Sequence, residues 1–388
     1  MADLNLSLAN GKIVKDYSKK FYLVQPQKYP SVSYALAKMG AILKEDFIRC
    51  GDKDPLPDFA RIDNSPAGYD DAATSIVMDN VTGVRAGMIG IVELSREGIM
   101  VTAVGAATKT LTVTRAIFGV AAAIPHGTVI TWLSTPMQEG WPASDLSARM
   151  RLAVERTNYI QRFVEPVNWT GTMEAVTDNG GLQFQQTKPV LRQDAQDLLK
   201  RDLNVSLLLG VGLTLPGTRG PITVSSGILG TSYYQDHTAM DITNRAALEA
   251  LVRDPLKYGG PEMLAPCSPV AFSAMQYLYQ ANNIGDFSGG VLKEVGVDVG
   301  LIRTPWGRIR PYVDWTLVDA WDNVNSRWLG KFELWNPDLV RFRPLRRIGR
   351  YALPKDGDNA TEVIGCEGGW EFDCTKALFV KTGVIAPA

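Results

Sequence analysis

Hydrophobic and polar residues alternate with a period of two in several short segments between residues 57 and 142. The clearest case is Thr110–Arg115, in which Leu111 and Val113 lie on the same side. This period is typical of a half-buried strand, and the glycines and asparagines between the segments favour turns. We therefore predict a small β barrel or sandwich. Its five expected strands are Ser75–Asp79, Met88–Leu94, Ile99–Val104, Thr110–Arg115 and Thr128–Leu133.

A long helix is predicted between Thr187 and Gly210. Its apolar residues recur at helical spacing and form one broad stripe: Leu191, Ala195, Leu198, Leu199, Leu203 and Leu207. Thr187 is suited to cap this helix, and Pro189 in its first turn would cost no hydrogen bond. Gly210 is suited to end it. At 1.5 Å per residue the helix is about 33 Å long, so it can serve as the spine of a domain.

Weaker patterns predict further helices and strands on both sides of the long helix. The expected helices are Ser33–Leu43, Asp145–Thr157 with Ser144 as its cap, Thr243–Arg253 and Pro269–Gln280. The expected extended segments are Tyr159–Ala175, 308–350 and 361–383. Together with the β segments near the N-terminus, they indicate an α+β fold.

Five tryptophans lie within thirty residues: Trp306, Trp315, Trp321, Trp328 and Trp335. Aromatic residues among basic ones can stack on single-stranded bases. However, alternation over Arg308–Val318 favours a half-buried strand. The expected inward face is Ile309, Val313, Trp315 and Leu317, and the expected outward face is Arg308, Arg310, Tyr312 and Asp314. We therefore expect these tryptophans to pack in the core rather than to bind bases.

Composition and charge limit the class of protein. The chain has 388 residues, of which 45% are hydrophobic and 21% are charged, so a globular protein of about two or three structural units is expected. Lys and Arg number 40 and Asp and Glu number 41. A protein that grips DNA over a wide surface is basic, so this balance leaves room only for local or weak contact with nucleic acid.

The four cysteines are Cys50, Cys267, Cys366 and Cys374, and no CxxC pair occurs. We expect unpaired thiols in a reducing cytosol and no zinc site. The chain contains no run of 18 apolar residues, and its first 15 residues lack the apolar core of a signal peptide. The sequence thus predicts a cytoplasmic protein that does not enter a membrane.

No motif indicates catalysis. The two histidines, His126 and His237, lack a partner arrangement suited to a catalytic triad. The glycines from Gly210 to Gly217 lack the Lys and Ser/Thr of a phosphate loop, and Asp356–Glu367 departs from a calcium loop at its ligand and glycine positions. We therefore predict no enzymatic activity, no cofactor and no bound metal.

Five arginines occur within ten positions: Arg341, Arg343, Arg346, Arg347 and Arg350. Phe342, Leu345 and Ile348 lie between them, which indicates a strand with one packed and one basic face. Such a face can contact acidic residues of a neighbouring subunit or line a lumen that holds nucleic acid. Because the whole chain is nearly neutral, we predict that Arg346 and Arg347 contact carboxylates of the same or a neighbouring subunit rather than DNA.

The order of these elements resembles the major capsid proteins of tailed phages, which have the Hong Kong 97-type fold. Gly98–Val104 with Thr110–Arg115 is similar to the β module inserted in the extended loop of one such family. Asn158–Phe163 with Trp169–Thr172 resembles the stretch before that family's long helix, and residues 338–367 resemble its C-terminal strands. The family commonly ends its long helix with an acidic residue, where this chain has Asn204.

The resemblance implies a domain organisation. Residues 1–56 would be an N-terminal arm, and 57–175 an extended loop carrying the β module at about 70–138. Residues 176–217 would form a peripheral domain around the spine helix. Residues 218–305 would form an axial domain, and 306–388 the returning strands of both domains.

The resemblance also implies function and partners. The chain would form hexamers and pentamers in the icosahedral head shell that encloses a double-stranded DNA genome, assembled in the host cytoplasm. Its partners would be copies of itself, a separate scaffolding protein, a portal complex, weakly bound DNA and, in some heads, a decoration protein. Two alternatives stay open: an encapsulin-like compartment, and a β-rich enzyme with an accessory domain.

Overall fold

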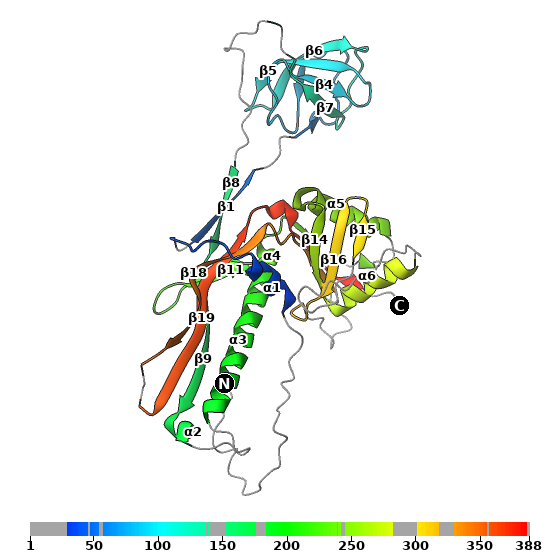
Figure 1. Ribbon diagram of the computed structural model, residues 1–388. Coiled ribbons are helices and arrows are strands. Elements are labelled where there is room, and N and C mark those ends of the chain that lie inside the picture. Colours follow the sequence, from blue (N-terminus) through cyan, green and yellow to red (C-terminus); the bar gives the residue numbers. More distant parts are fainter. Residues whose placement is uncertain are drawn as a thin grey trace. The chain divides into compact units, whose positions relative to one another are not determined.

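The computed structural model divides into two compact units (Figure 1). The first unit comprises residues 1–52 and 155–388, and the second comprises 53–154. Each contains hydrophobic core of its own. The residues described by the structure are 29–45, 47–53, 57–136, 139, 153–175, 184–238, 240–241, 245–281, 301–317, 330–354 and 357–385.

The second unit is a small antiparallel β structure. Its strands are β2 (Phe59–Arg61), β3 (Ser75–Val77), β4 (Ile89–Val92), β5 (Gly98–Gly105), β6 (Thr110–Phe118) and β7 (Val129–Ser134). They follow the order β2-β7-β4-β5-β6-β3. A strand lies at each of the five predicted positions. The sixth strand, β2, was not predicted; it has three residues, of which only Ala60 is buried.

The two end strands of this sheet meet each other. Asp63 N donates a hydrogen bond to Val77 O at 3.0 Å, and Asp79 N donates one to Arg61 O at 2.8 Å. Ile62 and Met78 form an antiparallel bridge between these contacts. The sheet therefore closes into a barrel, one of the two predicted forms, and side chains such as Ile76 and Ile99 fill its interior without exposure to solvent.

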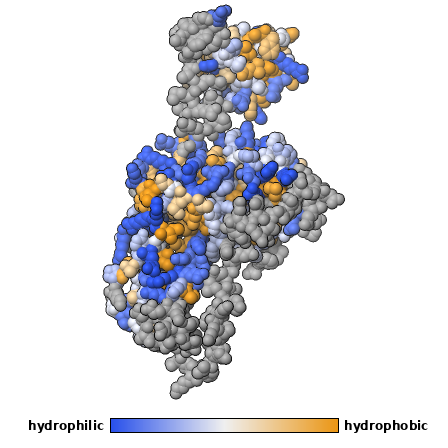
Figure 2. All heavy atoms as spheres, viewed as in Figure 1, coloured by the Kyte–Doolittle hydropathy of each residue, from blue (hydrophilic) through white to orange (hydrophobic). Residues whose placement is uncertain are grey.

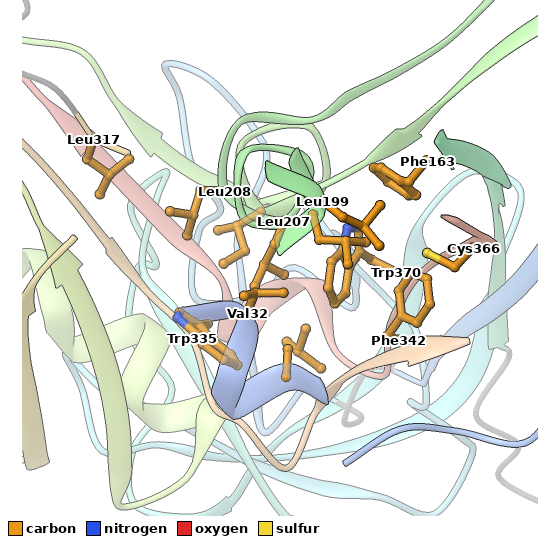
Figure 3. Close-up of a cluster of buried hydrophobic side chains, with 14 of the residues drawn as sticks. Val32, Phe163, Leu199, Leu207, Leu208, Leu317, Trp335, Phe342, Cys366 and Trp370 are labelled. Atoms are coloured by element: carbon orange, nitrogen blue, oxygen red, sulfur yellow. The ribbon is translucent and has the colours of Figure 1, made fainter. Parts of the chain in front are cut away.

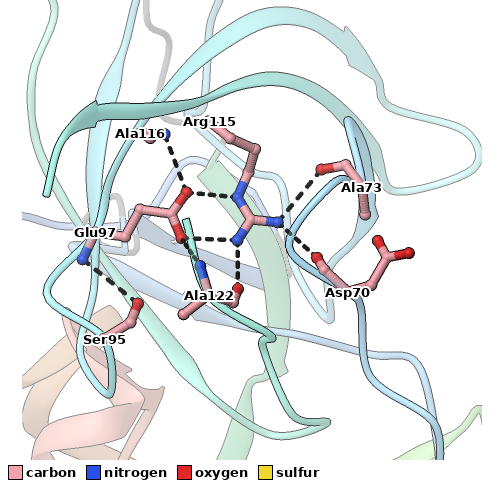
Figure 4. A network of polar contacts seen from close by, with 7 residues as sticks. All are labelled: Asp70, Ala73, Ser95, Glu97, Arg115, Ala116 and Ala122. Carbon is pink, nitrogen blue, oxygen red and sulfur yellow. Dashed lines mark hydrogen bonds and ion pairs between the residues drawn. The ribbon is translucent and has the colours of Figure 1, made fainter. Parts of the chain in front are cut away.

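A buried ion pair connects the loops of this barrel (Figure 4). Arg115 Nε and Nη2 donate to the two oxygens of Glu97 at 2.6 and 2.7 Å. The amides of Ala116 and Ala122 also donate to Glu97, at 3.0 and 3.3 Å. Arg115 in turn donates to the carbonyl of Asp70 at 2.9 Å. Burial raises the pKa of Glu97, but these hydrogen bonds outweigh it and hold the pKa below its ordinary value.

In the first unit, the long helix α3 (Phe184–Leu209) packs against a three-stranded antiparallel sheet. The strand order is β18 (Val340–Ala352), β19 (Asn359–Phe372) and β9 (Gln161–Thr170). Figure 3 shows the core between them, in which Leu199 and Leu207 of the helix lie near Phe342 and Trp370 of the sheet. Helix α1 (Pro30–Ala37) adds Val32 to the same core.

A six-stranded mixed sheet forms the rest of the first unit's core. Its strand order is β12 (Tyr234–Asp236), β20 (Phe379–Thr382), β17 (Lys331–Leu334), β14 (Glu262–Cys267), β16 (Gly307–Val313) and β15 (Ile302–Thr304). Helices α5 (Arg245–Gly259) and α6 (Pro269–Ala281) contribute to the core on one face. Its other face contributes to the core of the long helix.

Shorter elements complete the first unit. They are β1 (Phe47–Lys53) paired with β8 (Ala153–Tyr159), β10 (Val211–Leu215) paired with β11 (Ile222–Ser226), β13 (Met240–Asp241) paired with β21 (Val384–Ile385), α2 (Gly171–Ala175), α4 (Ile228–Thr231) and the 3₁₀ helix η3 (Thr375–Ala377). Because β1 and β8 pair, the chain leaves the first unit and returns to it along one two-stranded ribbon.

Three helix predictions need correction. The helix expected at Ser33–Leu43 is α1, Pro30–Ala37, so residues 39–43 are not helical. The predicted helix Asp145–Thr157 is wrong over its described part, because Ala153–Tyr159 is strand β8. Pairing with β1 satisfies its backbone and overrides the helical spacing, and residues 145–152 lie outside the described residues. The long helix begins at Phe184, not after Thr187, so Pro189 is its sixth residue. Its predicted end is confirmed, since Gly210 directly follows it.

The predicted faces of Arg308–Val318 are also wrong in part. Ile309 and Leu317 are buried as expected, but Tyr312 and Asp314, assigned to the outward face, are buried too. Trp315, assigned to the core, is 41% exposed. For Tyr312 the reason is that β16 lies inside a sheet with a hydrophobic core on each face, so side chains on both faces of this strand are buried. Asp314 and Trp315 follow the end of β16, where the period of a strand no longer applies.

Candidate functional site

The five arginines of the predicted basic strand lie on β18. As expected, Phe342 between them is buried in the core. Ile348 departs from the expectation, since it is 43% exposed. β18 has register irregularities between Pro344 and Gly349 where it pairs with β19, and these break the strict alternation of its side chains.

Two of the arginines bind carboxylates on the neighbouring strand. Arg341 pairs with Asp373, and Arg343 Nη1 lies 3.0 Å from Glu371 Oε1. Arg343 Nε also donates to the carbonyl of Ala41 at 2.8 Å. Gly40 N and Leu43 N bond to the carbonyls of Phe342 and Pro344, so the segment after α1 runs along this part of β18. This end of the strand is therefore committed to contacts within the chain.

Arg346 shares one carboxylate with an arginine of β9. Arg162 Nε lies 2.8 Å from Glu367 Oε1, and Arg346 Nε lies 3.4 Å from Glu367 Oε2. The side chains of the two arginines are 77% and 73% exposed, while that of Glu367 is 11% exposed. Arg347 is also exposed, with no ion-pair partner among the described residues. The single carboxylate of Glu367 thus contacts two guanidinium groups.

Arg350 belongs to a second cationic group, which is centred on Glu362 of β19. Arg192 of the long helix donates to both Glu362 oxygens at 2.8 Å, and Lys188 Nζ lies 3.4 Å from Oε1. Arg350 Nε lies 3.9 Å from Oε2. The bonds from Arg192, with the nearby charges of Lys188 and Arg350, hold the pKa of Glu362 below its ordinary value despite its burial. The sheet around these carboxylates therefore carries a surplus of positive charge.

The outward face of the three-stranded sheet is hollowed beside Arg162 and Arg346. Val164, Gly365 and Gly349 are register partners across β9, β19 and β18. Around Gly365, a groove of about 410 Å³ is lined by Val164, Tyr351, Leu353 and Val363, with Arg162, Arg346 and Glu367 also in its lining. The apolar walls of this groove can bind an apolar side chain, and the two arginines beside them can bind a carboxylate.

Asn204 is a structural residue whose partners the sequence does not indicate. Its Nδ2 lies 3.1 and 3.0 Å from the two oxygens of Asp314, and its Oδ1 accepts a hydrogen bond from Val32 N at 2.8 Å. Ser31 Oγ donates to Asp314 Oδ2 at 2.5 Å and lies 2.8 Å from Tyr312 Oη. The long helix, α1 and the end of β16 are thus tied together by buried polar groups. The only indication in the sequence is the departure at Asn204 from the resembling family's acidic residue.

The described residues do not assemble a recognisable reaction centre. They contain no group of three or more His, Cys, Asp and Glu side chains placed to hold a metal ion. All four cysteines are unpaired, as predicted, and burial raises the pKa of Cys366 to about 12, so this thiol stays protonated. Among the helices in the described part of the chain, none is long and apolar enough to cross a membrane. Trp321 and Trp328 lie outside the described residues; Trp335 is fully buried and Trp306 is 53% exposed.

Comparison with protein families identifies the chain. Residues 5–384 match the family described as SU10 major capsid protein. The chain belongs to the SU10 major capsid protein family. The predicted resemblance to tailed-phage major capsid proteins is thereby confirmed, as is the predicted role as the subunit of a capsid shell. No curated protein matches the sequence.

Solved structures similar to this capsid protein include phage particles and an encapsulin. A structure from Mycobacterium phage Bobi is 10% identical with a TM-score of 0.44, and the match covers 100% of both chains. The capsid of Myoviridae phage XM1 is 10% identical with a TM-score of 0.38, covering 64% of this chain and 82% of that one. The SrpI encapsulin of Synechococcus elongatus is 10% identical with a TM-score of 0.39, covering 61% and 78%. With TM-scores below 0.5, the assignment rests on the family match.

A capsid protein acts by contact with other subunits, so its surface is its functional site. Membership of the family points to a structural role and implies self-association into hexamers and pentamers of a shell. The face seen in Figure 2 has apolar residues grouped among hydrophilic ones on both units. The grooved and cationic face of the β18-β19-β9 sheet is the candidate contact surface of the first unit.

Proposed function

We propose that this capsid protein builds the icosahedral head shell of a tailed phage around a double-stranded DNA genome. The observation that carries the proposal is the family match over residues 5–384, nearly the whole chain. The near balance of 40 basic and 41 acidic residues supports it, because a shell must hold DNA without binding it tightly and its subunits must not repel one another.

The two halves of the first unit fit the roles of the Hong Kong 97-type fold. Helix α3 with the β18-β19-β9 sheet would form the peripheral domain, with α3 as its spine. The six-stranded sheet with α5 and α6 would form the axial domain near the symmetry axes of the capsomers. Strand β9 lies within the range 57–175 assigned to the extended loop, but it packs against α3 in the first unit, so we assign it to the proposed peripheral domain.

The β barrel fits the role of the module inserted in the extended loop. The second unit, residues 53–154, is longer than the predicted module at about 70–138. Its strands β2 to β7 span Phe59–Ser134, and a ribbon of β1 and β8 connects it to the first unit. A closed barrel has no free sheet edge, which suits a module placed outside the common fold on the outer surface of a shell.

The implied partners follow from this role. We propose that the subunits assemble in the host cytoplasm with a separate scaffolding protein and a portal complex. Contact with packaged DNA would be weak, and a decoration protein is a further candidate partner. An encapsulin-like compartment and a β-rich enzyme are less supported, since the family match names a capsid protein.

The test is self-assembly of the full chain expressed with its scaffolding protein. We expect sedimentation velocity to show capsomers or fast-sedimenting particles, and negative-stain electron microscopy to show closed shells. The portal and DNA can be omitted, since empty shells already report subunit assembly. A monodisperse monomer under all of these conditions would overturn the proposal.

A further inference from the structure

Gly365 lines the groove on the outward face of the β18-β19-β9 sheet. A Cβ atom at Gly365 would lie 2.5 Å from the carbonyl oxygen of Phe163, so no side chain can stand there without moving the backbone. At Gly349, its partner on β18, an added Cβ would lie 3.1 Å from Tyr351 Oη, so the missing side chain makes space for the Tyr351 ring that lines the groove. The hollow is therefore a fixed feature of the sheet.

The apolar walls of this groove are exposed to solvent. Val164, Tyr351 and Leu353 line the same groove and are 54%, 50% and 49% exposed. Contiguous exposed apolar residues with a polar rim are typical of protein interaction sites. The long helix covers the opposite face of the sheet, which supplies the core. Packing within the chain therefore does not explain why apolar residues lie on the outward face.

One end of the groove carries unbalanced positive charge. Arg162 and Arg346 both reach the single carboxylate of Glu367, and both guanidinium groups remain largely exposed. Each guanidinium has five N–H donors, of which one carboxylate can accept only some. Free donors at a fixed position are suited to a second carboxylate, which would accept charge-assisted hydrogen bonds.

We propose that this groove binds an extended acidic segment of a second copy of the chain. An apolar side chain of that segment would lie over Gly365, and a neighbouring carboxylate would lie between Arg162 and Arg346. The inference rests on the proposed function, in which copies of the chain surround one another in a shell.

Charge complementarity favours a second copy. The whole chain has one more acidic than basic residue, whereas in the groove two arginines, Arg162 and Arg346, share the single carboxylate of Glu367. The rest of the chain must therefore carry a surplus of carboxylates, which neighbouring copies can offer to this face. Nucleic acid fits less well, because phosphates would satisfy the arginines but leave the walls of Val164, Tyr351 and Leu353 in contact with water.

The test uses two groove variants and two matched controls. Val164→Lys fills the groove and adds charge, and Arg346→Glu removes the cation that faces the incoming carboxylate. Val190→Lys on α3 and Arg253→Glu on α5 make the same changes at exposed positions outside the groove. Circular dichroism and the thermal midpoint of the dissociated subunit check that each variant folds.

We expect both groove variants to lower the yield of empty shells at least tenfold, measured by sedimentation, with the controls within twofold of the wild type. A benzophenone amino acid in place of Tyr351 should cross-link to a second copy within shells. The same amino acid in place of exposed Tyr233 should give no cross-link to the segment that occupies the groove. Normal yields of empty shells from both groove variants would overturn the inference. The inference would also be overturned if the variants weakened only DNA-filled particles and left empty shells unchanged. Failure of the wild type to form shells would overturn the proposed function and this inference with it.

Discussion

Asn204 of the long helix lies with its amide nitrogen 3.1 and 3.0 Å from the two carboxylate oxygens of Asp314 at the end of β16. Both residues are fully or almost fully buried. The amide can donate to a carboxylate, whereas an acidic residue at position 204 would place two carboxylates together in the core. An amide, and not a second carboxylate, therefore suits this buried position beside Asp314.

Replacement of Asn204 should destabilise the subunit. In Asn204→Ala, Asp314 loses two hydrogen-bond contacts in the core and Val32 N loses its acceptor, so we expect the free energy of unfolding to fall by about 2–4 kcal/mol. Asn204→Asp should also be destabilised at pH 7, because its carboxylate repels that of Asp314. Urea denaturation of the dissociated subunit measures both.

The matched control for this prediction is Asn168→Ala, since Asn168 is exposed on β9. Its free energy of unfolding should change by less than about 0.5 kcal/mol, as is usual for surface substitutions. Equal effects at positions 168 and 204 would contradict the role assigned to the buried hydrogen bonds.

The Glu97–Arg115 pair should govern the stability of the β barrel. Arg115→Met leaves the carboxylate of Glu97 buried without its cation, which costs about 3–5 kcal/mol in comparable pairs. Hydrogen exchange of the full chain should accelerate over residues 57–136 and remain unchanged in α3. The double variant Glu97→Gln with Arg115→Met should recover part of the loss, because it removes the uncompensated charge.

Arg61→Met is the control for the barrel, because the side chain of Arg61 is exposed. Exchange in the barrel should then stay close to that of the wild type. Faster exchange in α3 than in the barrel after Arg115→Met would show that the ion pair does not act locally.

Glu333 on β17 should make stability fall as the pH rises. It is almost fully buried, and its Oε2 has no hydrogen-bond partner among the described residues. Burial, and then the charge of Asp314, raise its pKa well above the ordinary value, although Lys331 opposes this. Between the ordinary and the raised pKa only the unfolded chain releases the proton, so the free energy of unfolding declines by about 1.4 kcal/mol per pH unit over that window.

Glu333→Gln cannot ionise, so it should be more stable than the wild type at pH 7.5 by more than about 1 kcal/mol. The difference should shrink towards pH 4.5, close to the ordinary pKa of a glutamate, where only about half of the unfolded chains have released this proton. Urea denaturation at pH 4.5, 6.0 and 7.5 measures this, with exposed Glu93→Gln as the control. A difference that does not change with pH would contradict the assignment.

Removal of the barrel should leave the first unit folded. The strands β1 and β8 pair, so residues 57–152 can be replaced by a short Gly/Ser linker between neighbouring strand ends. We expect far-UV circular dichroism to retain the helical signal of α3, α5 and α6, while shells become less stable to guanidinium. Loss of that helical signal would show that the barrel is part of the main core.

The sequence was sufficient to predict elements whose pattern reflects one buried face. The long helix has an apolar stripe on one side, and the barrel strands alternate between the barrel interior and solvent. At Leu199 and Leu111 the position expected to be buried from the sequence pattern is therefore buried in the structure. It was not sufficient for β16, where cores on the two faces bury Tyr312 and Ile309. It also failed for β8, whose partner β1 lies about a hundred residues earlier in the chain.

The candidate contact surface was predictable only in part. The five arginines of β18 stand out by composition, but their partners do not. Glu367 accepts from Arg162 and Arg346, and this meeting depends on the register of three strands far apart in the sequence. Likewise, the groove depends on Val164 and Gly365 being register partners, which spacing along the chain cannot indicate.

The most direct test of the central claim is a cryo-electron microscopy reconstruction of particles formed by the full chain with its scaffolding protein. The account predicts an icosahedral shell of hexamers and pentamers, with α3 and the β18-β19-β9 sheet of each subunit resolved in the wall. Discrete particles of one or a few chains, with no capsomers under any assembly condition, would contradict it.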